Sequence, residues 1–223
     1  MSSPLLVVGN KRYSSWSLRP WLLLRVNGVD FREQRVSLYQ GEYKPEILRI
    51  SPAGKVPVLI DGDVTVWDSL AICEYAAESL GISRGWPRDV KARAHARSIT
   101  AEMHAGFAAL RTRCTMNVAR TPSSVELDAP AAADVARVRS IWSDCLARYG
   151  GPFLFGDFGI ADAFYAPVAV RFDRYRLFSP TDATDAGDAA ARAWVERVLA
   201  LPAMREWVAA GVAETDLLPQ FEK

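Results

Sequence analysis

Three serines lie close together in the stretch YSSWSLRPWLLL, which follows a short apolar run and opens a segment of helical character. They are Ser14, Ser15 and Ser17. Serine oxygens at such a place accept hydrogen bonds from the unpaired N–H groups of a first helical turn. The same hydroxyls and N–H groups can instead hold an anion. The pattern leaves both interpretations open, a helix cap and an anion-binding site.

Two other pairs of residues stand at the start of a predicted helix or strand. Asp68 and Ser69 stand at the start of the apolar helical segment SLAICEYAAESL, where a plain N-cap is the simple interpretation. Val56 and Pro57 begin the run VPVLID, and a trans proline at a strand start is the commoner case. Neither pair specifies a ligand by itself.

Metal and disulfide chemistry is not favoured by the remaining reactive side chains. Cys73, Cys114 and Cys145 are widely spaced and form no C-x-x-C pair, so we expect buried or incidental thiols. His95 and His104 stand nine positions apart in one helical segment, which places them on opposite faces. They cannot share a metal ion there, and we expect no metal cofactor.

Composition is typical of an ordinary soluble protein. Half of the 223 residues are hydrophobic, and 27 Lys and Arg balance 26 Asp and Glu. This balance favours neither disorder nor a nucleic-acid partner. The start, MSSPLLVVG, has no basic region and only a short apolar run. A cytoplasmic location with no membrane association is therefore the expectation.

The hydrophobic pattern divides the chain into two halves of different character. The first half predicts the order β-α-β-α-β-β-α, with a hairpin at Gly62-Asp63. Its strands are expected at 5–9, 31–38, 56–61 and 64–68, and its helices at 17–28, 45–50 and 69–80. After the linker GISRGWP only helices are expected, at 91 to about 118, 131–149, 160–172, 189–200 and 203–210.

Four motifs in this order resemble those of cytosolic glutathione S-transferases, particularly the zeta class. Ser14-Ser15-x-Ser17-x-Arg19 is similar to the family's N-terminal serine motif. SPAGKVPVLID is similar to the loop with a cis proline, WDSLAICEYAAE to the acidic-Ser pair, and FGDFGIADAFYAPV to a helix-capping segment. The resemblance covers nearly the whole chain and implies a bacterial, serine-type member. It implies a thioredoxin-like α/β domain at 1–80, which binds glutathione, and an all-helical domain at 88–223, which forms the electrophile site.

The sequence departs from the family pattern at two of these places. Gly159 stands where the family usually has a Ser or Thr cap, and glycine caps a helix almost as well. Asp68 stands where many members have Glu, so the charge is kept on a side chain that is one methylene shorter.

The resemblance assigns the serines to thiolate chemistry. A thiol with a pKa near roughly 8.5 is mostly protonated at neutral pH, and the thiolate is the nucleophile. A hydroxyl donor at a helix N-terminus favours the thiolate through its hydrogen bond and the helix dipole. By its position before Arg19, Ser14 is expected to stabilise the thiolate, with Ser15 as the second catalytic candidate. Arg19 is expected to tie the helix to the second domain.

The other implied residues divide between the two substrates. The resemblance gives glutathione binding to Ser17, Gln40, Lys44, Lys55, Val56, Pro57, Asp68 and Ser69. A solvated surface explains Gln40, Lys44 and Lys55 equally well. The electrophile pocket is expected to include Trp16, Met103, Phe107 and Arg111. Core packing also explains Met103 and Phe107, and an acidic substrate or a solvated helix face explains Arg111.

Three functions follow from the resemblance. The first is a glutathione S-transferase, a homodimer that conjugates glutathione to a small electrophile in detoxification. The second is a zeta-like cis-trans isomerase of the maleylacetoacetate type, although Trp16 stands where the zeta pattern has Cys. The third is a non-catalytic binding or scaffold protein that keeps the fold.

Overall fold

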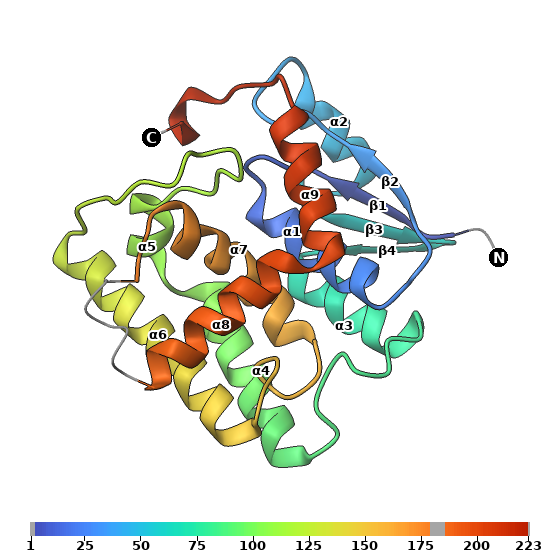
Figure 1. Ribbon diagram of the computed structural model, residues 1–223. Coiled ribbons are helices and arrows are strands. Elements are labelled where there is room, and N and C mark those ends of the chain that lie inside the picture. Colours follow the sequence, from blue (N-terminus) through green and yellow to red (C-terminus); the bar gives the residue numbers. More distant parts are fainter. Residues whose placement is uncertain (1–2, 179–185, 223) are drawn as a thin grey trace.

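The computed structural model describes residues 3–178 and 186–222 (Figure 1). The first part contains β1 (Leu5–Val8), α1 (Ser15–Val26), β2 (Arg32–Arg35), α2 (Tyr43–Ile50), β3 (Val58–Asp61), β4 (Val64–Trp67) and α3 (Ser69–Ser79). The second contains α4 (Val90–Ala105), α5 (Ala108–Arg113), α6 (Ala129–Tyr149), α7 (Ile160–Arg174), α8 (Ala186–Ala200), α9 (Pro202–Ala213) and the short 3-10 turn η2 (Pro219–Phe221).

The four strands form one mixed sheet in the order β2-β1-β3-β4. β1 runs parallel to β2 and antiparallel to β3, and β3 and β4 form the predicted hairpin, in which Asp61 pairs with Val64. Gly62 supplies a positive φ of 61° in the hairpin turn. The predicted order β-α-β-α-β-β-α is confirmed, although β2 is shorter than the predicted run 31–38.

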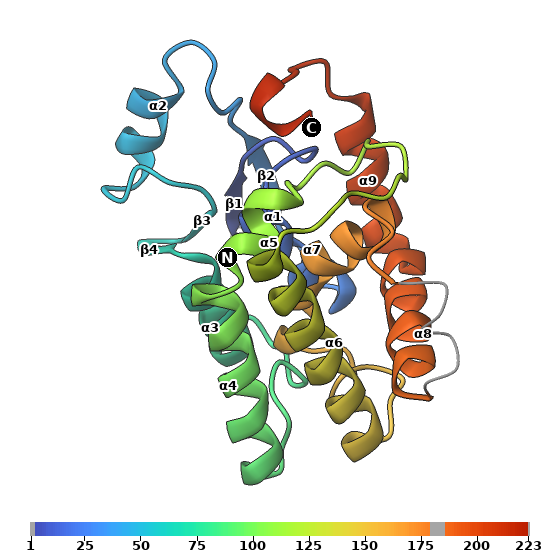
Figure 2. The ribbon, with the colours of Figure 1, turned by 90° about the vertical axis from the view of Figure 1, so that its left-hand side faces the viewer.

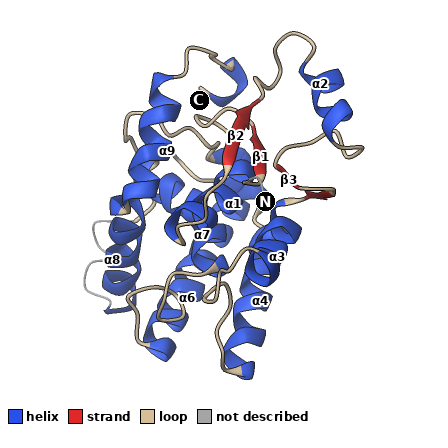
Figure 3. Ribbon diagram, turned by 90° about the vertical axis from the view of Figure 1, so that its right-hand side faces the viewer, coloured by secondary structure: helices blue, strands red, loops and turns tan. Residues whose placement is uncertain are grey.

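The two faces of the sheet are covered unequally (Figure 3). Val7 packs with Ile47 of α2 in a small cluster on one face, whereas Leu6 and Val8 on the other face belong to the main core. Alternate residues of a strand point to opposite faces, which explains this division. The main core continues through α1 and α3 into the helical domain, so both domains share one hydrophobic interior.

Helix α7 lies at the centre of the helical domain, packed against α1, α4 and α8 (Figure 2). Gly159 is its N-cap, and the Asp162 carboxylate accepts hydrogen bonds from the N–H groups of Gly159 and Leu154 and from the Trp194 indole. Burial raises the pKa of Asp162 to about 6. This confirms the capping segment that the sequence predicted.

The predicted helix from 91 to about 118 is wrong, because the chain breaks at Gly106 and Phe107. Gly106 is the C-cap of α4, and Phe107 has a φ of 57° before α5 begins. The Phe107 ring is buried in the core. The sequence pattern does not show the break, because apolar residues keep helical spacing on both sides of it.

Within residues 3–178 and 186–222, none of the helices combines the length and the apolar character needed to cross a lipid bilayer.

Candidate functional site

A cavity of about 1120 Å³ lies between the two domains and the C-terminal tail. Most of the predicted site residues line it: Ser14, Ser15, Trp16, Lys44, Lys55, Val56, Pro57, Asp68, Ser69 and Arg111. We call the part beside Ser14, Val56 and Asp68 the α/β end, and the part beside Arg111, Thr115, Arg171 and Phe221 the helical end. Ten predicted residues from separated segments thus meet at one hollow.

The serine motif forms both a helix cap and a wall of the cavity. Ser14 is the N-cap of α1, and its Oγ accepts a hydrogen bond from the Ser17 N–H at 3.2 Å. The Ser14 hydroxyl also donates to Ser17 Oγ at 2.8 Å, and Ser17 Oγ accepts from the Gly9 N–H at 3.0 Å. Ser15 is the first residue of α1 and is partly exposed to the cavity. The two interpretations of the motif, cap and anion site, are therefore compatible.

Tyr13 also reaches the cavity, but its hydroxyl group is already engaged. It donates to the Glu222 carboxylate and accepts from the Leu218 N–H at 3.2 Å. Burial and the hydrogen bond to Glu222 raise the pKa of Tyr13. Because its single proton points at a carboxylate, Tyr13 is a poorer donor to a thiolate than the neighbouring serines are.

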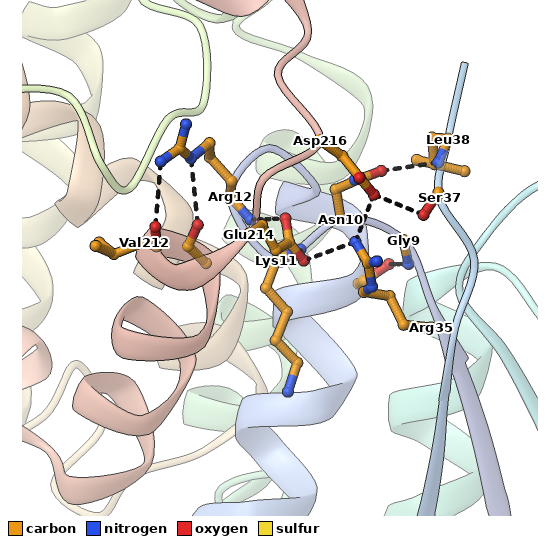
Figure 4. A network of polar contacts seen from close by, with 12 residues as sticks. Gly9, Asn10, Lys11, Arg12, Arg35, Ser37, Leu38, Val212, Glu214 and Asp216 are labelled. Atoms are coloured by element: carbon orange, nitrogen blue, oxygen red, sulfur yellow. Dashed lines mark hydrogen bonds and ion pairs between the residues drawn. The ribbon is translucent and has the colours of Figure 1, made fainter. Parts of the chain in front are cut away.

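The C-terminal tail fixes the loop after β1 through Lys11 and Arg12 (Figure 4). The Glu214 carboxylate accepts hydrogen bonds from the N–H groups of Lys11 and Arg12, at 2.7 and 3.1 Å. Arg35 forms ion pairs with Glu214 and with Asp216, at 3.4 and 2.9 Å. These contacts hold the tail against the loop after β1 and the end of β2. Farther along the tail, Leu218 and Phe221 line one side of the cavity.

The loop before β3 and the start of α3 complete the α/β end. The Val56–Pro57 peptide bond is cis, as the motif predicts. Asp68 has a φ of 73°, a rare conformation for a residue other than glycine, and its Oδ1 accepts from the Leu70 N–H at 2.8 Å. Such strained residues cluster at functional sites. Asp68 Oδ2 lies 3.3 Å from Nε2 of His104, which reaches across from α4.

Three arginines lie in or beside the helical end. Arg19 is buried between the rings of Trp16 and Phe164 and donates to Ser69 Oγ at 3.4 Å. It therefore joins α1 to α7, as expected for a structural tie between the domains. Arg111 lies over the Trp16 ring, and the buried Arg171 of α7 also lines the cavity. Burial and the neighbouring arginines lower the pKa of Arg19 to about 9 and that of Arg171 to about 10.

Four of the predicted site residues do not line the cavity: Ser17, Gln40, Met103 and Phe107. Ser17 is buried behind Ser14, where its hydroxyl contacts Ser14 and Gly9. Gln40 is exposed in the loop before α2. Met103 and Phe107 are buried in the main core and do not line the cavity. For both, core packing is the interpretation that the structure favours.

The sequence pattern did not indicate that Arg171, His104 and the C-terminal tail belong to this region. Arg171 lies in an otherwise apolar stretch of α7, where an arginine is unusual. That feature of the sequence could have indicated a functional residue. The tail carried no signal, because its contacts with Tyr13 and Thr115 join residues that are 205 and 106 positions apart in the sequence.

The thiols and histidines offer little for metal binding. All three cysteines are free and buried. Within the described part of the chain, His95, Asp144 and Cys145 place their ligand atoms within 4.8 Å of one another. His95 Nδ1, however, lies 3.0 Å from the Tyr149 hydroxyl, and burial raises the pKa of Cys145 to about 12. A thiol that stays protonated is a poor ligand.

Comparison with known proteins agrees with this geometry. The family model "Glutathione S-transferase, N-terminal domain" matches residues 13–79. Glutathione S-transferase 1 of Dianthus caryophyllus is 31% identical over 160 residues, covering 70% of this chain and 72% of that protein. A probable maleylacetoacetate isomerase of Caenorhabditis elegans is 30% identical over 166 residues, covering 74% of this chain and 77% of that protein. The structure of a glutathione transferase homologue from Burkholderia gl BGR1, with bound glutathione, has a TM-score of 0.67 and 24% identity, and the alignment covers 96% of this chain and 100% of that one.

The fold and the site define a protein with a thioredoxin-like domain followed by an all-helical domain. The chain belongs to the glutathione S-transferase family. This confirms the predicted superfamily, its fold class and its membership of an enzyme family. The bacterial origin, the serine-type chemistry, the domain limits 1–80 and 88–223 and the roles of individual residues stay predictions.

Proposed function

We propose that the protein is a glutathione transferase in which the Ser14 hydroxyl stabilises the glutathione thiolate. The observation that carries the proposal is the position of Ser14, which lines the cavity and caps α1 at the same time. The positive end of the α1 dipole favours a negative charge at this place. No side chain has to act as a strong base.

Ser17 has a supporting part in this proposal. The Ser14 and Ser17 hydroxyls are 2.8 Å apart, and hydroxyl protons rotate. When Ser17 donates to Ser14, the Ser14 proton is free to turn toward a sulfur in the cavity. The Gly9 N–H holds Ser17 Oγ in place under either arrangement. Ser17 is then a positioning residue that does not touch glutathione.

The rest of glutathione is assigned to the other residues of the α/β end. The Val56 backbone beside cis Pro57 pairs with the cysteinyl unit in the manner of an added strand. Asp68 and the N-terminus of α3 at Ser69 take the γ-glutamyl ammonium and carboxylate. Lys55 is exposed beside the cavity and serves the glycyl carboxylate, whereas the ammonium of Lys44 is engaged with the Gly54 carbonyl.

The test is a titration of bound glutathione by thiolate absorbance in Ser14→Ala and Ser15→Ala. Loss of one charge-assisted hydrogen bond should raise the thiol pKa in Ser14→Ala by roughly one to two units. Glutathione affinity, measured by calorimetry, should stay within a few-fold. A large shift in Ser15→Ala alone would move the role to Ser15, and an unchanged titration in both variants would reject the serine-type mechanism.

A second candidate reaction is cis-trans isomerisation of a maleyl diketo acid, with glutathione as the catalyst. The similarity to the probable maleylacetoacetate isomerase supports it, because that match covers both domains. Addition of the thiolate, rotation and elimination would need the same activated thiolate. Absorbance assays with a maleyl diketo acid and with a neutral aryl halide separate the two reactions. Glutathione binding without turnover of either substrate would support a scaffold function instead.

We also propose that the protein is a cytoplasmic homodimer that serves in detoxification. Val64 and Trp67 on the edge strand β4 are 40% and 47% exposed, and a partner subunit would cover them. Light scattering of the purified protein tests the dimer, and a monomer at micromolar concentration would contradict it.

A further inference from the structure

The helical end of the cavity has a cationic wall that glutathione activation does not by itself require. Arg111 of α5 and Arg171 of α7 both line the cavity, although 60 positions separate them in the sequence. Arg171 is only 4% exposed. Two guanidinium groups have thus been brought to one surface, and one of them is almost fully removed from bulk water.

Neither arginine has an acidic partner in the part of the chain that the structure describes. Arg171 donates to the Cys114 and Pro167 carbonyls at 2.8 and 3.0 Å and contacts the Met116 sulfur. Among the described residues, Arg111 donates to the Gly106 carbonyl alone, at 3.4 Å. Carbonyl dipoles orient these groups but do not neutralise them, and a buried cation without a counter-ion is costly.

The same charges repel one another and their neighbour Arg19. Burial lowers the pKa values of Arg19, Arg111 and Arg171, and the charge of Arg111 lowers those of Arg19 and Arg171 further. Among the described residues, Asp68 is the only carboxylate that lines the cavity, and it lies 3.3 Å from His104. An anion at the helical end would relieve the repulsion and supply the missing counter-charge.

The other walls indicate what else this anion would carry. Trp16, Met116, Leu218 and Phe221 are apolar, so an uncharged carbon skeleton fits between them. Arg111 lies 4.6 Å from the centre of the Trp16 ring, a contact that holds its planar guanidinium in a fixed orientation. A planar guanidinium with free N–H groups matches a carboxylate in two-pronged fashion.

We infer that the electrophile carries a carboxylate, which Arg111 and Arg171 bind at the helical end while the thiolate attacks from the α/β end. This inference rests on the proposed transferase function and names its substrate class. It applies equally to conjugation and to isomerisation. It assigns Arg171, which lies near the end of α7, to substrate recognition.

The test compares two electrophiles that differ only in this charge. Ethacrynic acid is an aryl enone with a carboxylate far from the reacting carbon, and its methyl ester has the same enone without the charge. Steady-state kinetics should favour the acid by at least about tenfold in kcat/KM. In Arg111→Gln this preference should fall to near one, mainly through KM for the acid, and glutathione affinity should change less than about threefold.

Arg113→Gln is the matched control. Arg113 is on the same helix, is exposed, donates to the Glu126 carbonyl and does not line the cavity. The Arg113→Gln variant should prefer the acid over the ester as strongly as the wild type does. Arg171→Lys keeps the charge but not the planar fork, so an intermediate preference is expected, with thermal unfolding as the check of folding. In the wild type, the preference for the acid over its ester should also decrease as salt is added, because salt screens the attraction between the arginines and the carboxylate.

The possible failures are distinguishable. If neither compound is turned over and calorimetry finds no glutathione binding, the proposed function itself fails. If both compounds are turned over equally well by the wild type, or the preference survives in Arg111→Gln, the carboxylate assignment is overturned. A loss of glutathione affinity in Arg111→Gln, with the preference for the acid unchanged, would instead place a glutathione carboxylate at this wall and also overturns it.

Discussion

The two ends of the cavity are built in different ways. The α/β end is made from short motifs in which the relevant groups are neighbours in sequence, such as Ser14-Ser15, Val56-Pro57 and Asp68-Ser69. Its chemistry comes from helix N-termini and backbone groups. The helical end is assembled from α5, α7 and the tail, and its chemistry comes from single charged or aromatic side chains. Local motifs therefore define the end proposed to bind glutathione, and long-range packing defines the end proposed to bind the electrophile.

The largest expected effect concerns the tail that joins the two ends. Glu214→Ala removes the acceptor of the Lys11 and Arg12 N–H groups and a partner of Arg35. Leaving buried N–H groups unpaired should lower the free energy of unfolding by about 1 to 3 kcal/mol. Urea denaturation measures this, and Glu214→Gln, which keeps an acceptor, should lose less. Equal losses in the two variants would show that the ion pair with Arg35, rather than the two N–H groups, is what matters.

The second prediction concerns the α/β end alone. Asp68→Asn keeps an oxygen that can cap α3 but removes the charge proposed to hold the γ-glutamyl ammonium. Glutathione affinity should fall by roughly tenfold, while kcat at saturating glutathione changes little. Isothermal calorimetry and steady-state kinetics measure the two quantities. A loss of kcat with an unchanged KM for glutathione would contradict the proposal that Asp68 binds the γ-glutamyl ammonium.

The third prediction concerns the helical end alone. Phe221 packs against the rings of Tyr13 and Tyr39 and lines the cavity. Phe221→Ala should raise KM for the electrophile by roughly three- to tenfold, because apolar contact area is lost. Glutathione affinity should change less, which calorimetry tests. A change of the same size for both substrates would mean that the two ends are not separable in this way.

The smallest expected effect is a dependence of the free energy of unfolding on pH, caused by His104, which lies beside Asp68. Burial lowers the pKa of His104, with Arg19 and Arg111 acting in the same direction and Asp68 in the opposite one. The unfolded chain then binds a proton more readily than the native one below about pH 6.5. The wild type should therefore lose stability more steeply than His104→Gln as pH falls from about 7 to 5. Parallel urea-denaturation curves for the two proteins across this range would contradict the assignment.

The sequence was informative wherever chemistry and local conformation coincide. Ser14 could be placed at the start of α1 because a cap and an anion site use the same N–H groups, and the hairpin at Gly62 follows from its positive φ. At Met103 and Phe107 the sequence left both a core position and a cavity wall open, because helical spacing does not distinguish them, and the structure places both in the core. The break at Phe107 was missed for the same reason.

By itself, the sequence determined the order of strands and helices in the first half of the chain, the family, and most of the residues that line the α/β end, because these depend on contacts within a few residues of one another. The tertiary structure alone decided that Arg171 reaches the cavity, that Leu218 and Phe221 of the tail line one side of it, and that Arg111 lies over the Trp16 ring. Each of these depends on the packing of segments that are remote in the chain, and packing is settled by the shape and burial of the whole core rather than by any local pattern.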